Sequence, residues 1–287
     1  MQMASLLDSL TAADIRHEPF PHLVARDLLP ADLVARLIDG FPPIEVVTEG
    51  KPLGNNRRYS YPARKLLEDP RVSDDWKELA GGHLTQGFLD RFLDLFGPAI
   101  RDLYPQLAER HGPDLALRSG VRQRDLFRDA DVLLEAQACV NTPPITTSTV
   151  RGPHVDLPDK LFAGLFYLRH PDDDSRGGDL QLCRYRQGNK VLRGRSIDAA
   201  DIEVVDTVRY ESNVLVLFLN GIEAVHSVTP REPTQHPRLF LNLVGEVSQP
   251  LFDLNCYQNE SSILRRVIRA CDMERKRALR YVHHLLG

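Results

Sequence analysis

The stretch Arg238-Leu-Phe-Leu-Asn-Leu-Val244 has the alternation of a β-strand whose two faces differ. Side chains leave a strand on alternate sides, so Arg238, Phe240 and Asn242 share one face and the three leucines take the other. An arginine in such a strand is costly to desolvate without a counter-anion. A bound carboxylate is one candidate, because a guanidinium pairs with it through two hydrogen bonds. An ion pair with one of the protein's own acids is the equal alternative.

Short runs of β-branched and aromatic residues, separated by turns, fill the chain from about residue 131 to 248. Seven such runs without helices between them predict an antiparallel sandwich or barrel. The predicted strands are 132–141, 161–168, 179–186, 202–210, 213–220, 224–228 and 238–247.

The segments on either side of this β-rich part have helical periodicity. Helices are predicted over 29–40, over 6–15 as a short amphipathic helix, and over 72–111 with breaks near Gly81-Gly82 and Gly97-Pro98. Residues 44–66 read as loop or weak strand, and 260–286 as a helix with a basic face. We therefore expect a single domain over 1–287 that is mainly β with flanking helices. Its parts are a mainly helical 1–130, a β core over 131–248 and a C-terminal helical segment over 249–287.

Composition and charge narrow the class of protein. With 42% hydrophobic residues the 287-residue chain can bury a sizeable core, and a net charge of -4 gives no reason to expect nucleic acid or an anionic membrane as partner. The longest apolar run, 214–219, is too short to span a bilayer, and the N-terminus lacks a secretion-signal pattern, so a cytoplasmic protein is predicted. The four cysteines form no Cys-x-x-Cys pair, which favours free thiols. Nothing in the sequence indicates an oligomeric state.

A candidate metal site begins in Arg151-Gly-Pro-His-Val-Asp156. In extended backbone His154 and Asp156 leave the same face, so both can point at one ion. His226, which follows a strongly apolar run, is the best candidate for a third ligand. Two histidines and one carboxylate, with the other coordination positions open, form the set used by non-haem Fe(II) oxygenases. A core histidine at 226 and a turn-capping aspartate at 156 are the structural alternatives.

Other charged residues have both a functional and a structural interpretation. For the arginines and tyrosines of 57–61 a solvated loop position is favoured, and the functional alternative is a substrate entrance. For the acidic triplet 172–174 a solvated loop tip is favoured, and the functional alternative is a cation site. Arg151 and Lys160 flank the metal pair and contact either solvent or an anionic substrate. Arg231 is a rival of Arg238 for a bound carboxylate, but its proline-rich turn favours a position at the rim.

Taken in order, these pieces resemble the Fe(II)/2-oxoglutarate-dependent oxygenases of the double-stranded β-helix, or jelly-roll, fold. The matching pieces are His154-Val-Asp156, Gly177-Gly-Asp-Leu180, Asn213-Val-Leu-Val-Leu-Phe-Leu219, Val225-His-Ser-Val-Thr-Pro230 and Arg238, twelve positions beyond His226. Their order is similar to the prolyl-hydroxylase-like branch, where lysine is common at the position of Arg238. The resemblance covers about 132–247, and an N-terminal Pro-Phe-Pro-His segment followed by a helix is also similar.

The resemblance implies that His154, Asp156 and His226 hold Fe(II) and that Arg238 binds the distal carboxylate of 2-oxoglutarate. Dioxygen then oxidises a substrate C–H bond, with succinate and CO2 as co-products. Halogenating relatives lack the carboxylate ligand, so Asp156 favours hydroxylation, with desaturation or ring formation as alternatives.

Three further residues are candidates for facing the co-substrate. Tyr167 stands where relatives place a second contact to the distal carboxylate, and it reads equally as a plain core tyrosine. Gln137 and Asn141, on the preceding strand, are weaker candidates, because they face either the co-substrate or only the turn.

A small metabolite or amino acid is the expected substrate, and a peptidyl proline is the alternative that the resembling branch suggests. Two other classes stay open. One is a non-catalytic jelly roll that binds a metal or ligand, and the other is a cupin-type isomerase or dioxygenase that uses a different metal.

Overall fold

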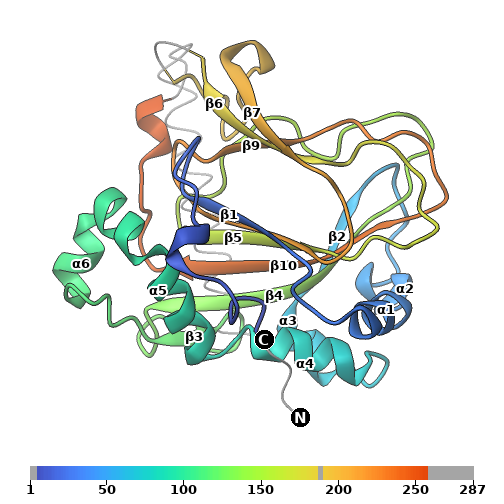
Figure 1. The fold of residues 1–287 in the computed structure, drawn as a ribbon, viewed down its shortest axis with the longest axis horizontal. Coiled ribbons are helices and arrows are strands. Elements are labelled where there is room, and N and C mark those ends of the chain that lie inside the picture. The colour runs from blue at the N-terminus through green and yellow to red at the C-terminus, as the bar shows by residue number, and fades with distance from the viewer. Residues whose placement is uncertain (1–4, 187–189, 258–287) are drawn as a thin grey trace.

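Two β-sheets face each other, and helices cover the outer side of the larger one (Figure 1). The computed structural model describes residues 5–186 and 190–257. The strands are β1 His22–Arg26, β2 Arg58–Tyr61, β3 Ser119–Val121, β4 Val132–Asn141, β5 Lys160–Tyr167, β6 Leu180–Tyr185, β7 Ile202–Val208, β8 Val214–Leu219, β9 Val225–Val228 and β10 Arg238–Val247. The larger sheet has the order β1-β8-β5-β10-β4-β2, with β3 beside β4, and the smaller sheet has the order β7-β6-β9. All pairs except β3–β4 are antiparallel, so the predicted jelly-roll core is confirmed.

The helices precede most of the strands in the chain. They are α1 Ala31–Asp39, α2 Ile44–Val47, α3 Ala63–Glu68, α4 Asp74–Gly82, α5 Gln86–Leu103 and α6 Pro105–His111. Short 3-10 turns cover Ala12–Asp14, Ala199–Asp201 and Leu254–Tyr257. In the part of the chain that the structure describes, no helix is long and apolar enough to cross a membrane.

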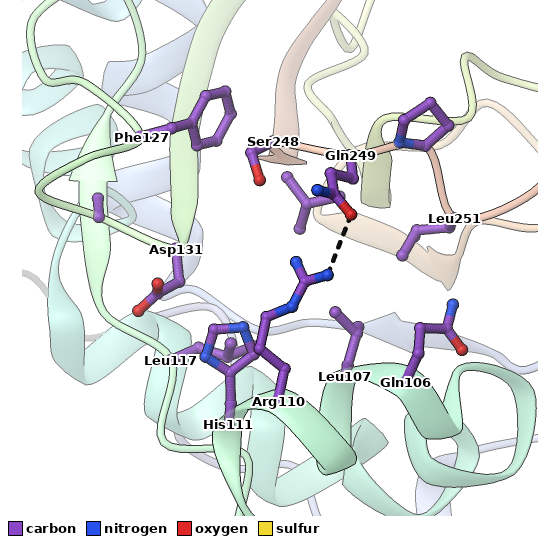
Figure 2. A pocket seen from close by; sticks show the side chains of 13 residues that line it. Gln106, Leu107, Arg110, His111, Leu117, Phe127, Asp131, Ser248, Gln249 and Leu251 are labelled. Carbon is purple, nitrogen blue, oxygen red and sulfur yellow. Dashed lines mark hydrogen bonds between the residues drawn. The ribbon is translucent and has the colours of Figure 1, made fainter.

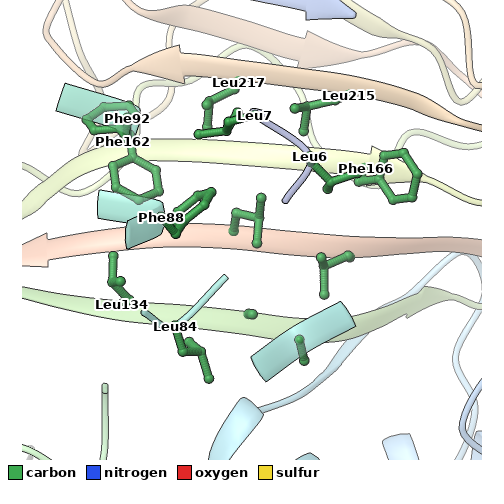
Figure 3. Close-up of a cluster of buried hydrophobic side chains, with 14 of the residues drawn as sticks. Leu6, Leu7, Leu84, Phe88, Phe92, Leu134, Phe162, Phe166, Leu215 and Leu217 are labelled. Carbon is green, nitrogen blue, oxygen red and sulfur yellow. The ribbon is translucent and has the colours of Figure 1, made fainter. Parts of the chain in front are cut away.

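The alternation of β10 divides the core into two layers, as its sequence predicts. Leu239, Leu241 and Leu243 belong to the layer between the larger sheet and the helices, whereas Phe240 belongs to the layer between the two sheets. In the outer layer, Phe88 and Phe92 of α5 pack on Phe162 of β5, with the rings of Phe92 and Phe162 4.3 Å apart (Figure 3). The layer between the two sheets, called the interior layer below, is the one that faces the candidate site.

Two helix predictions are wrong. Residues 6–15 form turns and the 3-10 turn Ala12–Asp14 instead of a helix. Contacts with the rest of the fold hold Leu6 and Leu7 in the core without helical backbone. The Leu6 amide donates to His83 Nε2 at 3.1 Å, and Arg91 Nε donates to the Leu7 carbonyl at 3.2 Å. The predicted break at Gly97-Pro98 is also absent, since α5 continues through Pro98. Residues on both sides of the proline pack in the core, which outweighs the hydrogen bond that proline cannot make.

Strands β1 and β3 and helices α2 and α3 were not predicted from the sequence, whereas β2 falls within 44–66, which was predicted as loop or weak strand. β1 pairs with β8 at one edge of the larger sheet, β2 pairs with β4 at the other edge, and β3 lies beside β4. They are three to five residues long, too short for a clear alternation. The helix predicted over 260–286 lies outside the described residues.

Candidate metal and co-substrate site

The three candidate metal ligands meet where the segment before β5 pairs with β9. His154 and His226 exchange both backbone hydrogen bonds, each 3.0 Å long, so their side chains lie side by side with ring centres 4.2 Å apart. Asp156 follows two residues later on the same face. One ligand atom from each residue lies within 4.8 Å of the others, and all three side chains are buried. The site therefore offers two imidazoles and one carboxylate to a single ion.

Hydrogen bonds fix the orientation of both imidazoles. His154 Nδ1 lies 2.9 Å from the Gly152 carbonyl, and His226 Nδ1 lies 2.9 Å from the Ala224 carbonyl. A carbonyl only accepts, so each Nδ1 carries the proton and donates it. Each Nε2 is thereby left with its lone pair, which is the usual arrangement of a metal-binding histidine.

The electrostatic environment keeps all three groups in their metal-binding forms. Burial and then the neighbouring His226 lower the pKa of His154 to about 2, although Asp156 opposes the shift. Burial also lowers the pKa of His226. For Asp156, burial raises the pKa, but Lys160, whose Nζ lies 3.0 Å from Oδ2, and the two imidazoles outweigh it and hold the carboxyl below its usual range. At neutral pH the site thus presents neutral imidazoles and an ionised carboxylate.

We expect the free energy of unfolding of the metal-free protein to fall as the pH is lowered below 6.5. In the folded state the pKa of both imidazoles lies below the ordinary value of 6.5, so the unfolded chain takes up protons first. Each histidine contributes up to about 1.4 kcal/mol per pH unit. Urea unfolding with a chelator at pH 7.5, 6.5 and 5.5 measures the fall, which should be shallower in His226→Phe. Equal free energies at the three pH values would contradict the assignment.

Arg238, the first residue of β10, lies in the interior layer opposite Asn141 of β4 and is 2% exposed. Its guanidinium lies 4.6 Å from the ring centre of Tyr167, 5.0 Å from that of Tyr210 and 5.2 Å from that of Phe240. Among the described residues its Nε and Nη2 have no hydrogen-bond partner, and neither do the Tyr167 hydroxyl and Asn141 Oδ1. A buried guanidinium with two unpaired nitrogens beside a buried hydroxyl without a partner fits a bound carboxylate.

The phenol of Tyr167 is a hydrogen-bond donor at neutral pH. Burial raises its pKa, and the charge of Arg238 only partly opposes the shift. The structure therefore has Tyr167 and Asn141 next to Arg238.

Gln137 is not part of this group. It faces Asn242, whose Nδ2 donates to Gln137 Oε1 at 3.2 Å, and it stands four residues along β4 from Asn141. That spacing corresponds to about 13 Å of extended chain. Gln137 lines the interior layer deeper in the barrel.

Tyr210 was missed by the sequence analysis. It lies just beyond β7, fully buried, and its hydroxyl accepts the Leu239 amide hydrogen at 2.9 Å, so it fixes the start of β10 next to Arg238. Its place at the end of a predicted strand gave no sign of this role.

The rim position predicted for Arg231 is wrong, and so is the solvated position predicted for Asp173. Arg231 is 1% exposed, and its Nη2 donates to Asp173 Oδ2 at 2.8 Å while Nε donates to Ser175 Oγ at 3.0 Å. Arg169 Nε lies 3.6 Å from the same carboxylate oxygen. Asp172 and Asp174 are exposed, as expected of a loop tip. Arg231 Nη1 has no partner among the described residues, but Nε and Nη2 are committed to Ser175 and Asp173, so of the two rivals Arg238 is the one available to a bound carboxylate.

A separate pocket lies at the opposite end of β10 (Figure 2). α6 lines one side with Leu107, Arg110 and His111, and the residues after β10 line the other. Arg110 Nη2 bridges the two sides by donating to Gln249 Oε1 at 3.0 Å. The only group of three or more metal-ligating side chains in 5–186 and 190–257 is the His154, Asp156 and His226 set, so this pocket is not a second metal site.

Comparisons with known proteins find solved structures that are similar to this chain at low sequence identity. No protein-family model matches the chain, and no curated protein matches its sequence. A Pseudomonas putida prolyl-4-hydroxylase is 18% identical over 79% of this chain and 93% of its own, with a TM-score of 0.41. HygX from Streptomyces hygroscopicus, with nickel and 2-oxoglutarate bound, is 16% identical over 79% and 83%, with a TM-score of 0.38. The non-heme alpha ketoglutarate dependent carbocyclase SnoK from nogalamycin biosynthesis is 14% identical over 83% and 87%, with a TM-score of 0.40.

Proposed function

We propose that this chain is an Fe(II)/2-oxoglutarate-dependent oxygenase. The observation that carries the proposal is the pairing of two features in one barrel. One is a buried set of two histidines and one aspartate whose free lone pairs point to a common place. The other is the buried Arg238 guanidinium, which has no acid partner among the described residues and lies beside the Tyr167 hydroxyl. Three protein ligands leave room on the metal for a chelating keto acid and dioxygen.

An Fe(II) ion bound with 2-oxoglutarate supplies the activation of dioxygen and the oxidation of a C–H bond, with succinate and CO2 as co-products. The protein's own residues bind, orient and exclude water. Lys160 holds the Asp156 carboxylate in place, and Arg238 with Tyr167 donates hydrogen bonds to the distal carboxylate of the co-substrate. Phe218 packs on His226 with ring centres 4.8 Å apart, which closes one wall of the site with an apolar side chain.

The finer proposal is hydroxylation of a small metabolite or amino acid. Asp156 supports it, because an aspartate ligand takes the position that a halide would need. Peptidyl-proline hydroxylation is the alternative reaction. The described cysteines are free thiols, which agrees with the cytoplasmic location that we propose.

Succinate release tests the proposal. The purified chain with Fe(II), ascorbate and 2-oxoglutarate in air should form succinate, and a screen of metabolites should find one that gains a single oxygen atom. Protein loaded with Fe(II) under argon should also change its absorption spectrum when 2-oxoglutarate is added. Metal binding with neither succinate nor the spectral change would favour a non-catalytic jelly roll.

Replacing Arg238 by lysine should weaken 2-oxoglutarate binding about tenfold. The ammonium keeps the charge but loses the two-pronged contact, which corresponds to roughly one charge-assisted hydrogen bond. Calorimetry on the Mn(II)-loaded protein measures the dissociation constant, and Arg128→Lys, at an exposed position beside Asp129, is the matched control. An unchanged constant would favour a cupin-type enzyme that does not use Arg238.

A further inference from the structure

Three arginines lie around the metal and co-substrate sites, and the only acid that any of them contacts is the metal ligand Asp156. Arg58 of the edge strand β2 places its guanidinium 5.0 Å from the ring centre of Phe240 and donates to the buried Cys139 Sγ at 3.5 Å, so it leans over the barrel interior. Arg151 stands three residues before His154, and its carbonyl accepts the Val228 amide hydrogen at 2.9 Å. This bond fixes it next to the strand that carries His226.

Arg195 completes the cluster. Its carbonyl accepts the Val155 amide hydrogen at 3.0 Å, and its Nη1 lies 3.8 Å from Asp156 Oδ1. Arg151 and Arg195 are held on either side of His154, because His154 bridges both His226 and Ser196, the residue after Arg195. Partial burial and then the charges of Arg195 and Arg58 lower the pKa of Arg151, which agrees with this arrangement. The described residues include no ion pair between an acid and either Arg58 or Arg151.

A charge count shows that the positive charge of this cluster exceeds the negative charge near it. Asp156 is the only carboxylate in contact with Arg195, and it is already paired with Lys160 and needed by the metal. The two positive charges of Fe(II) balance the two negative charges of 2-oxoglutarate, so the charge of Arg238 adds to the excess. Like charges held together without counter-ions are unfavourable, so three guanidinium groups around one opening favour an anion there.

We propose that the substrate is a small molecule with an oxyanion group, a phosphate or a carboxylate, held by Arg58, Arg151 and Arg195 at the mouth of the barrel. This inference rests on the proposed oxygenase function and names the class of its substrate. The guanidinium groups orient the substrate by its anionic end, so that an apolar part reaches toward the metal. Arg58 and Arg151 are exposed, as the sequence analysis expects, but the Arg58 guanidinium also packs on Phe240, whose ring lies in the layer between the two sheets.

Calorimetry with phenyl phosphate, benzoate and benzyl alcohol tests the inference. The protein is first loaded with Mn(II) and saturated with 2-oxoglutarate under argon, so that the probes cannot occupy the place of the co-substrate. Phenyl phosphate or benzoate should bind and benzyl alcohol should not. Arg58→Gln, Arg151→Gln and Arg195→Gln should each weaken binding about five- to tenfold, a modest effect because the groups are partly exposed. Arg128→Gln should leave the dissociation constant unchanged.

The outcomes separate this inference from the proposed function. If 2-oxoglutarate binds but neither anionic probe does, the substrate class is wrong and the oxygenase proposal stands. Equal probe affinity in all variants would mean that the anion binds the metal alone, which also overturns the inference. If 2-oxoglutarate does not bind while probe binding depends on the three arginines, the anion site stands and the oxygenase proposal fails. The tighter of the two anionic probes identifies the oxyanion.

Discussion

Replacing His226 by alanine is expected to weaken metal binding by about 100-fold or more and to abolish succinate formation. Loss of a residue that only orients a metal ligand typically costs 10- to 100-fold in affinity, and His226 is proposed as a ligand itself. Two ligands would remain, His154 and Asp156, and a chelating pair binds a divalent ion weakly without the third donor. Calorimetric titration with Mn(II) under argon measures the affinity, and succinate release measures the activity.

The control for this variant is His17→Ala, which removes an exposed imidazole far along the chain from the site. It should bind Mn(II) as the unchanged protein does. Circular dichroism must show that His226→Ala is folded, because the imidazole is buried against Phe218. Unchanged metal affinity in a folded His226→Ala protein would make His226 a core histidine, the structural alternative that its sequence leaves open.

Local rules of β-structure account for what the sequence predicted about the fold and the site. The alternation of β10 predicted that Arg238 and Phe240 share one face, and in the structure that face lies between the two sheets. The i, i+2 spacing put His154 and Asp156 on one side of an extended segment. That His226 joins them depends on a backbone bridge between distant segments, which the order of motifs suggested but no local pattern determines.

Contacts between distant segments account for what the sequence analysis missed. The ion pair of Arg231 with Asp173 links a turn after β9 to a loop before β6, and nothing near either residue names the other. The sequence around Arg58 predicts a loop or a weak strand. Only the pairing of β2 with β4 brings its guanidinium over the ring of Phe240. In α5, packing on both sides of Pro98 overrides the local tendency of a Gly-Pro pair to end a helix.

The triplet of Asp172, Asp173 and Asp174 offers a test of one buried ion pair with its own control next to it. Asp173 is fully buried at the side chain, whereas Asp172 is 82% exposed. The carboxylate of Asp173 accepts hydrogen bonds from Arg231 Nη2 and, through Oδ1, from the Ser175 amide at 3.0 Å. Asparagine has the same shape and can still accept from Ser175, so the substitution removes mainly the charge.

Asp173→Asn is expected to lower the free energy of unfolding by about 3 to 5 kcal/mol. The substitution leaves the guanidinium of Arg231, 1% exposed, in the interior without a counter-ion, and removal of one partner of a buried pair has a cost of this size. Urea unfolding at pH 7.5 measures the change, and Asp172→Asn should stay within about 0.5 kcal/mol of the unchanged protein because its carboxylate is solvated. If both variants are equally stable, Asp173 does not stabilise the buried arginine. Since Arg231 and Arg238 both lie against Tyr210, Asp173→Asn should also weaken 2-oxoglutarate binding.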